Sequence, residues 1–192
     1  MAIRRPQAAP EEPLPVSRYH GRRMSEAEYL ALPVEKPYLE YVDGVVLQKP
    51  MPDALHGRLI AFFDYLFYGY LLRAGGDGGP ERRMRLTDGS GYRLPDTAYW
   101  APGRPSGNDS TPSLAVEVRS RDQPMGDLRK KCRAFRANDV DCCWLIDPYR
   151  RSVEVFESGR DGERLMADEP LETAVMPGFS VSQAELWAAL ER

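Results

Sequence analysis

The sequence contains no long apolar run, and its first residues are polar and rich in proline. No uninterrupted hydrophobic stretch approaches the roughly 18 residues of a membrane span, so we expect no membrane-embedded protein. After Met1 the chain lacks the apolar segment that a secretory signal requires. These two absences favour a cytoplasmic protein.

Cysteine and histidine are scarce, with three of the former and two of the latter. Cys132, Cys142 and Cys143 cannot all pair, and adjacent cysteines rarely bridge each other. His20 and His56 lie far upstream, whereas a structural zinc site needs a second ligand pair at close spacing. We therefore expect neither a disulfide framework nor structural zinc, and the cysteines are expected to be small buried residues.

A strong charge of either sign is also missing. The formal net charge is -3, with 42% hydrophobic and 29% charged residues, which is typical of a folded globular domain. Two local basic clusters stand out, and each either contacts nucleic acid or forms a solvated surface. The clusters are Arg82, Arg83 and Arg85, and Arg129, Lys130, Lys131, Arg133 and Arg136.

The length and the proline pattern predict one domain with a tail. A chain of 192 residues can bury one core and is short for two. Residues 1–22 carry four prolines and little apolar content. We therefore expect a flexible tail over 1–22, followed by a single domain over 23–192.

Four segments have the apolar spacing or the cap residues of helices. Ser25 and Glu28 have the spacing of a capping box, and Ser182 is a typical N-cap residue. In the second segment, apolar residues recur at three- and four-residue steps, as in a helix packed on a sheet. The predicted helices span 25–32, 55–72, 127–137 and 183–190.

Strands are predicted between these helices. The pair Asp43-Gly44 between two β-rich runs is the strongest short-range signal of a hairpin, here over 38–47. Further strand-like runs are 83–86, 97–100, 114–118, 142–146, 152–156 and 164–166. The order of these elements predicts an α/β (α+β) fold, in which a mixed sheet is flanked by helices.

Asp96 and Glu117 are the residues whose placement points to chemistry. Asp96 begins a predicted strand, and Glu117 lies inside the apolar run 114–118, where an isolated carboxylate is costly to bury. Mg²⁺ prefers oxygen ligands, and a metal ion activates water for phosphodiester hydrolysis. The pair indicates a site for Mg²⁺, with Mn²⁺ as a substitute. The alternatives are that Asp96 caps a turn and that Glu117 faces solvent.

Lys131 lies in the early turns of the helix that follows Glu117. The four-residue spacing places Asp127, Lys131 and Phe135 on one side of that helix. If the helix folds back over the strand, it brings the Lys131 ammonium beside the carboxylates. There the ammonium would orient water or stabilise a charged transition state.

At these residues the chain resembles the Uma-two family of restriction-endonuclease-like proteins within the PD-(D/E)XK nuclease superfamily. The resemblance runs from about residue 24 to residue 190, and its specificity comes from the order and spacing of several short motifs. They are LEYVDG at 39–44, a helix opening at His56, YRLPD at 92–96, AVEVRS at 115–120, DLRKK at 127–131 and WLIDP at 144–148.

The resemblance implies a restriction-endonuclease-like fold and a set of site residues. It implies Asp96 and Glu117 as metal ligands, Lys131 as the catalytic lysine and Glu40 as an additional acidic member. Arg119 stands where the superfamily usually has its lysine, and because an arginine is permanently charged it cannot act as a base. Arg119 is then a candidate phosphate clamp.

Two candidate residues keep alternative roles. Glu40 either points inward as a member of the site or forms a salt bridge on the hairpin. His56 either touches substrate or caps the start of its helix.

The expected function is metal-dependent cleavage of DNA, and the resemblance also suggests a homodimer. The alternative is a catalytically inactive nuclease-fold module that binds nucleic acid or protein. Arg119 in place of the usual lysine favours that alternative.

Overall fold

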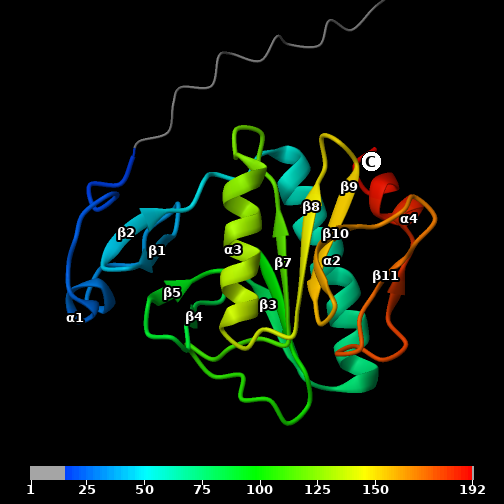
Figure 1. Cartoon of the computed structure of the whole chain (residues 1–192), viewed down its shortest axis with the longest axis horizontal. Helices are drawn as coiled ribbons and strands as arrows, with labels where there is room; N and C mark the ends of the chain where they lie inside the picture. Colours follow the sequence, from blue (N-terminus) through cyan, green and yellow to red (C-terminus); the bar gives the residue numbers. More distant parts are fainter. Residues whose placement is uncertain (1–15, 192) are drawn as a thin grey trace, which may run out of the picture.

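A six-stranded mixed sheet forms the middle of the protein (Figure 1), as seen in the computed structural model, which describes residues 16–191. The strand order is β10-β9-β8-β7-β6-β3; β7 and β8 pair in parallel, and the other neighbours pair antiparallel. The strands are β3 (Asp77–Pro80), β6 (Thr97–Trp100), β7 (Leu114–Val118), β8 (Cys142–Asp147), β9 (Ser152–Glu157) and β10 (Arg160–Arg164).

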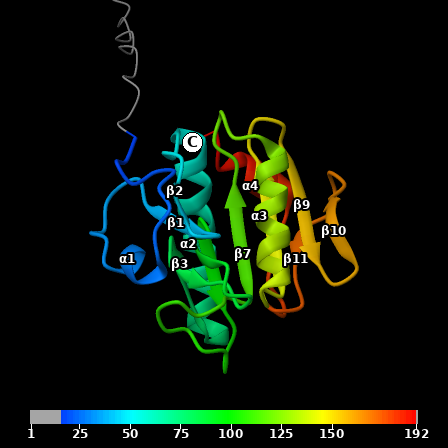
Figure 2. The same cartoon turned by 60° about the vertical axis from the view of Figure 1, so that its left-hand side comes forward.

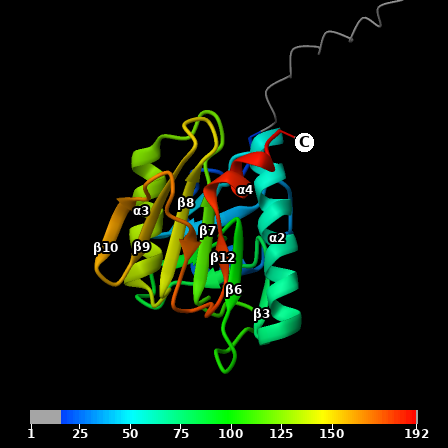
Figure 3. The same ribbon diagram turned by 90° about the vertical axis from the view of Figure 1, so that its right-hand side faces the viewer.

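Helix α3 (Met125–Ala137) connects the two parallel strands and covers one face of the sheet (Figures 1 and 3). Parallel neighbours need such a crossover because no tight turn can return the chain to the same end of the sheet. Leu128, Cys132 and Phe135 form the buried stripe of α3 and pack on the sheet. The three- and four-residue spacing of these residues places them on one side of the helix.

Helix α2 (Ala54–Ala74) covers the opposite face of the sheet (Figure 3). Its buried residues Leu59, Phe63, Phe67 and Tyr70 belong to the largest cluster of buried apolar side chains. The C-terminal elements extend this layer; they are β11 (Leu171–Glu172), β12 (Ser180–Val181) and α4 (Gln183–Ala188). Between residues 16 and 191, no helix is both long enough and apolar enough to cross a membrane.

A smaller four-stranded sheet lies beside the main one (Figures 1 and 2). Its order is β2-β1-β5-β4, and its strands are β1 (Leu39–Val42), β2 (Val45–Gln48), β4 (Met84–Arg85) and β5 (Gly91–Arg93). The predicted hairpin turn is present, with φ of 51° at Asp43 and 79° at Gly44. Helix α1 (Glu26–Leu30) packs here, and its Tyr29 ring stacks on Tyr41.

The segment before α1 contacts the hairpin. The Gly21 N–H donates to the Val46 carbonyl (2.8 Å), and the Val46 N–H donates to the Arg22 carbonyl (2.9 Å). Residues 1–15 of the expected tail lie outside the described residues. The boundary between tail and domain stays a prediction.

The fold class predicted from the sequence is confirmed, and all four predicted helices are present. One strand is displaced, because β10 spans 160–164 where the apolar run predicts 164–166. Strand β3 lies in a glycine-rich segment in which no strand was predicted. Glycine is needed there, because a Cβ on Gly76 would lie 2.4 Å from the Trp100 carbonyl oxygen.

Candidate active site

Three carboxylates from separate segments of the chain meet in one cavity of about 310 Å³. Glu40 comes from β1, Asp96 immediately precedes β6, and Glu117 lies in β7. They are only 5%, 4% and 2% exposed, respectively. Lys131 from α3 lines the same cavity. The structure therefore brings together the four residues that the sequence assigns to catalysis.

The direction of Glu117 follows from the alternation of β7. Val116 and Val118 belong to the apolar cluster on the α2 side, whereas Ala115 packs on the α3 side. Because successive side chains of a strand point to opposite faces, Glu117 faces α3 together with Ala115. The Asp96 N–H donates to the Val116 carbonyl (3.1 Å), which places Asp96 beside Glu117 at the edge of the same cavity.

Asp96 is held by three donors. Its Oδ1 lies 2.9 Å from Lys49 Nζ, and its Oδ2 accepts the Val118 N–H (2.8 Å) and lies 3.0 Å from His56 Nε2. Burial opposes ionisation, but Lys49 and His56 outweigh it and hold the pKa of Asp96 well below its usual range. Asp96 is therefore a carboxylate, as metal coordination requires.

Lys131 bridges the other two carboxylates. Its ammonium lies 2.8 Å from Glu40 Oε1 and 2.9 Å from Glu117 Oε1, and it donates to the Leu94 carbonyl (3.1 Å). Burial alone would lower the pKa of Lys131, but the charges of Glu117 and Glu40 raise it well above its usual value. Lys131 therefore stays protonated, and it can stabilise negative charge but cannot accept a proton.

Glu117 retains capacity to bind a cation. Its Oε1 is buried and has no hydrogen-bond partner within residues 16–191, and the Lys131 ammonium, 2.9 Å away, is its ion-pair partner. Burial raises the pKa of Glu117 to about 7, against the attraction of Lys131, and the negative charge of Asp96 adds to the rise.

The donor set of Asp96 and Glu117 fits a hard cation. No group of three or more His, Cys, Asp or Glu side chains within residues 16–191 is arranged to hold a metal ion. Mg²⁺ does not need such a group, since it commonly binds through one or two carboxylates and keeps several waters. The Asp96 and Glu117 carboxylates line the same cavity and offer oxygen ligands of this kind, each beside a lysine ammonium.

Glu40 points inward and positions its neighbours. Its Oε1 accepts the Leu94 N–H (2.9 Å), and its Oε2 lies 3.0 Å from Arg93 NH1. Burial raises the pKa of this carboxyl, but Lys131 and Arg93 more than offset the effect and lower it. Glu40 is thus an inward carboxylate that also forms salt bridges, and its partners come from α3 and β5.

His56 lies in the first turn of α2 and lines the cavity. The cap of this helix is Asp53, whose Oδ1 accepts the N–H groups of Leu55 and His56. Two roles were left open for His56, and the structure gives the capping role to Asp53. The imidazole contacts Asp96, and its Nδ1 has no hydrogen-bond partner in the part of the chain that is described.

Arg119 does not line this cavity. Its NH1 lies 3.0 Å from Asp147 Oδ2, its Nε donates to the Gln123 carbonyl (2.9 Å), and its guanidinium lies over the Tyr149 ring. Arg119, which occupies the position where the superfamily usually has its lysine, therefore contacts Asp147, Gln123 and Tyr149 instead of the cavity. Lys131 is the lysine that reaches Glu117.

The basic clusters are largely neutralised by acidic neighbours. Lys130, for example, is exposed on α3 and pairs with Asp127 at 3.0 Å. The other pairs are Arg129 with Glu154, Arg133 with Asp161, Arg82 with Asp77, Arg83 with Asp109 and Arg85 with Glu26. Of the residues in these two clusters, Lys131 is the one that lines the cavity.

The sequence reasoning missed Lys49 and Arg93. Lys49 directly follows β2, and its side chain is 7% exposed. One signal was available, because only four of the 26 basic residues are lysines, and the cavity contains two of them, Lys49 and Lys131. Arg93 lies within the YRLPD motif at 92–96, but the motif alone assigned it no role.

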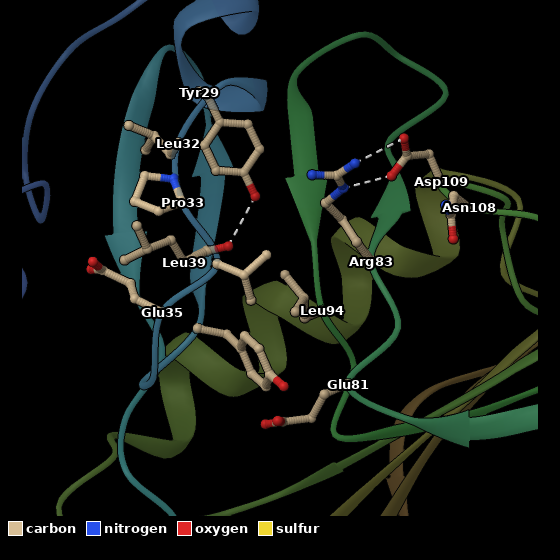
Figure 4. Close-up of a pocket in the computed structure, with 12 residues that line it drawn as sticks. Tyr29, Leu32, Pro33, Glu35, Leu39, Glu81, Arg83, Leu94, Asn108 and Asp109 are labelled. Atoms are coloured by element: carbon tan, nitrogen blue, oxygen red, sulfur yellow. Dashed lines mark hydrogen bonds and ion pairs between the residues drawn. The ribbon is translucent and has the colours of Figure 1, made fainter.

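A second cavity, of about 290 Å³, lies between the small sheet and the loop that carries Asp109 (Figure 4). Tyr29 lies on one side, with its hydroxyl donating to the Leu39 carbonyl, and Arg83 lies opposite, paired with Asp109. Glu81 also lines this cavity and is 3.4 Å from Lys49 Nζ. Lys49 therefore lies between the two cavities.

Comparisons with known proteins identify the family and the fold of the chain. The family model Uma2, described as "Putative restriction endonuclease", matches residues 26–189. A crystal structure described as "a putative nuclease belonging to DUF820" from Anabaena variabilis superposes with a TM-score of 0.76 at 21% identity. The match covers 87% of this chain and 99% of the other, and at that identity it establishes a shared fold. No curated protein matches the chain.

Proposed function

This chain belongs to the Uma2 family, and from that membership we propose that it is a metal-dependent endonuclease that hydrolyses phosphodiester bonds of DNA. The observation that carries the proposal is the meeting of Glu40, Asp96 and Glu117 around Lys131 in one cavity. Buried charges are costly and are retained most often where a site uses them.

Each of these side chains has a role in the proposal. Asp96 and Glu117 would hold Mg²⁺, or Mn²⁺ in its place, and the ion supplies charge neutralisation and a more acidic water. Lys131 remains a cation and would stabilise the charge that develops on the phosphate. Glu40 fixes the ammonium of Lys131, and His56 fixes the carboxylate of Asp96.

The proposal also covers the partners and the compartment. DNA is the expected substrate, and the cytoplasm is the expected compartment, since all three cysteines are free and buried.

A homodimer is also expected, because cleavage of both strands of a DNA duplex would use two active sites, one in each subunit. The exposed side chains Tyr65, Tyr68 and Leu72 lie on one face of α2 and offer a candidate interface, which sedimentation velocity at micromolar concentration tests.

Plasmid cleavage tests the proposed activity. Supercoiled plasmid is incubated with the protein in Mg²⁺, Mn²⁺ or EDTA, beside the variants Glu117→Gln and Asp96→Asn. We expect cleavage in either metal, none in EDTA and none with either variant. Cleavage that persists in EDTA, or with Glu117→Gln, would sink the proposed mechanism.

The second candidate function is an inactive nuclease-fold module that binds nucleic acid or protein. The observation in its favour is the charge balance, because the three carboxylates face three cations, Lys49, Arg93 and Lys131. It predicts DNA binding without cleavage and no heat of Mn²⁺ binding in isothermal titration. Metal binding that is lost in Glu117→Gln would favour the nuclease.

A further inference from the structure

Lys49 is a buried cation that the proposed mechanism does not use. Its side chain is only 7% exposed, and its Nζ lies 2.9 Å from Asp96 Oδ1. A lysine rarely loses its hydration unless a charged partner compensates for the loss. Here the partner is one of the two carboxylates assigned to the metal ion.

The ammonium and a divalent ion compete for this carboxylate. Asp96 Oδ2 is already engaged by the Val118 N–H and by His56, so Oδ1 is the oxygen that Lys49 shares with any incoming cation. Two cations at contact distances from one oxygen repel each other strongly in a poorly hydrated cavity. A bound ion therefore requires Lys49 to move away from Asp96.

Glu81 offers Lys49 a second partner. Its Oε1 lies 3.4 Å from Lys49 Nζ, on the side of the neighbouring cavity shown in Figure 4. The Glu81 N–H donates to the Asp96 carbonyl (3.2 Å), so the two acidic residues are fixed side by side. A small shift of the ammonium exchanges a contact with Asp96 for a contact with Glu81.

We propose that Lys49 is a built-in competitor of the divalent ion, occupying Asp96 until the ion displaces it toward Glu81. The inference rests on the proposed function, because it takes Asp96 and Glu117 as the metal ligands. It makes Lys49 a positioning residue that sets metal affinity, and Glu81 the acceptor that makes displacement feasible. The two residues then have opposite effects on the same equilibrium.

Isothermal titration with Mn²⁺ alone, without DNA, tests this opposition. Lys49→Met removes the competing charge and keeps the length of the side chain, so Mn²⁺ affinity should rise about tenfold. Glu81→Gln removes the acceptor, so Lys49 stays on Asp96 and affinity should fall several-fold. Lys130→Met, an exposed lysine of α3, is the matched control and should leave affinity unchanged.

Thermal unfolding provides a second readout that needs no activity. Lys49→Met leaves Asp96 with less positive charge nearby, so its melting temperature in EDTA should fall below that of the wild type. Added Mn²⁺ should then raise the melting temperature of this variant by more than it raises that of the wild type. A lower temperature in EDTA without the larger rise in Mn²⁺ would overturn the proposal.

The failure of this inference is distinguishable from the failure of the proposed function. If Glu117→Gln abolishes Mn²⁺ binding while Lys49→Met binds no more tightly than wild type, Lys49 is not a competitor. If Mn²⁺ binds equally well to the wild type and to Glu117→Gln, the metal site itself is misassigned, and both proposals fall. If the wild type shows no detectable Mn²⁺ binding in the titration and Lys49→Met does bind Mn²⁺, the result would support the inference.

Discussion

Val116 and Glu117 are adjacent in β7 and both buried, but they face opposite sides of the sheet. Val116 packs into the apolar cluster beneath α2, where Phe63 and Trp144 supply large aromatic surfaces. Glu117 enters the charged cavity beneath α3 and meets Lys131. One strand thus separates a face built on apolar packing from a face that buries charge.

The difference between the faces shows where stability and chemistry come from. Burial of apolar surface on the α2 side contributes free energy without special geometry. On the α3 side, desolvated carboxylates are costly, and each lysine or arginine partner only offsets that cost. We infer that the α2 face supports the fold and that the charged end of the α3 face is kept for function.

The largest expected effect comes from substituting each of the two neighbouring residues of β7, Val116 and Glu117, in separate variants. Glu117→Gln should lower plasmid cleavage by at least about 10²-fold, because a proposed metal ligand is lost, while the protein stays folded. Val116→Ala should instead lower the free energy of unfolding by about 1–3 kcal/mol and leave the folded protein active. Cleavage rates measure the activity of both variants, and urea denaturation measures their free energies of unfolding. Equal losses of activity would remove the distinction between the faces.

A second test compares two adjacent lysines of α3. Lys131→Ala should lower kcat by about 10²-fold and change DNA affinity little, because its ammonium lies inside the cavity. Lys130→Ala, from an exposed position, should keep kcat, weaken DNA binding modestly and reduce its salt dependence. Single-turnover kinetics and binding at several salt concentrations separate these outcomes. Purely affinity-type losses in both variants would reduce Lys131 to a member of the basic surface.

The pH dependence of stability sharpens the comparison further. Because the pKa of Glu117 is raised from 4.5 to about 7, the folded protein binds a proton that the unfolded chain has released between those values. The free energy of unfolding of the wild type should therefore fall as pH rises through this window. The Glu117→Gln variant lacks this proton, so its free energy of unfolding relative to the wild type should rise by about 1–3 kcal/mol as pH increases from 4.5 to about 7. Above that pH the difference should stay constant.

Urea denaturation in EDTA at several pH values measures this difference, since metal would compete with the proton. Val116→Ala is the matched control, and its stability relative to the wild type should stay constant with pH. A constant difference for Glu117→Gln would mean that the carboxylate is ionised throughout.

The smallest expected effect concerns a segment assigned to neither face. Its prolines and its few apolar residues predict that the residues before about Tyr19 contribute little to packing, and residues 1–15 of this segment lie outside the described residues. Their removal should change the melting temperature by less than about 2 °C, measured by calorimetry. A large drop would add a third contributor to stability beside the two faces.

Local patterns were sufficient to predict most elements of the fold. Ser25 and Ser182 cap helices as expected, and Asp43-Gly44 forms the predicted hairpin turn. These signals depend on a few neighbouring residues, so the sequence displays them directly. Strand β3 escaped prediction because its pairing with β6, not its own composition, makes it a strand.

The sequence by itself determined which carboxylates and which lysine to consider, since Asp96, Glu117 and Lys131 stand in a recognisable order. Only the tertiary structure decided that Lys49 and Arg93 join them and that Arg119 turns to Asp147 instead. Those outcomes depend on the direction of each side chain and on which strands become neighbours. Both are properties of contacts between distant segments, and such contacts form only when the sheet assembles.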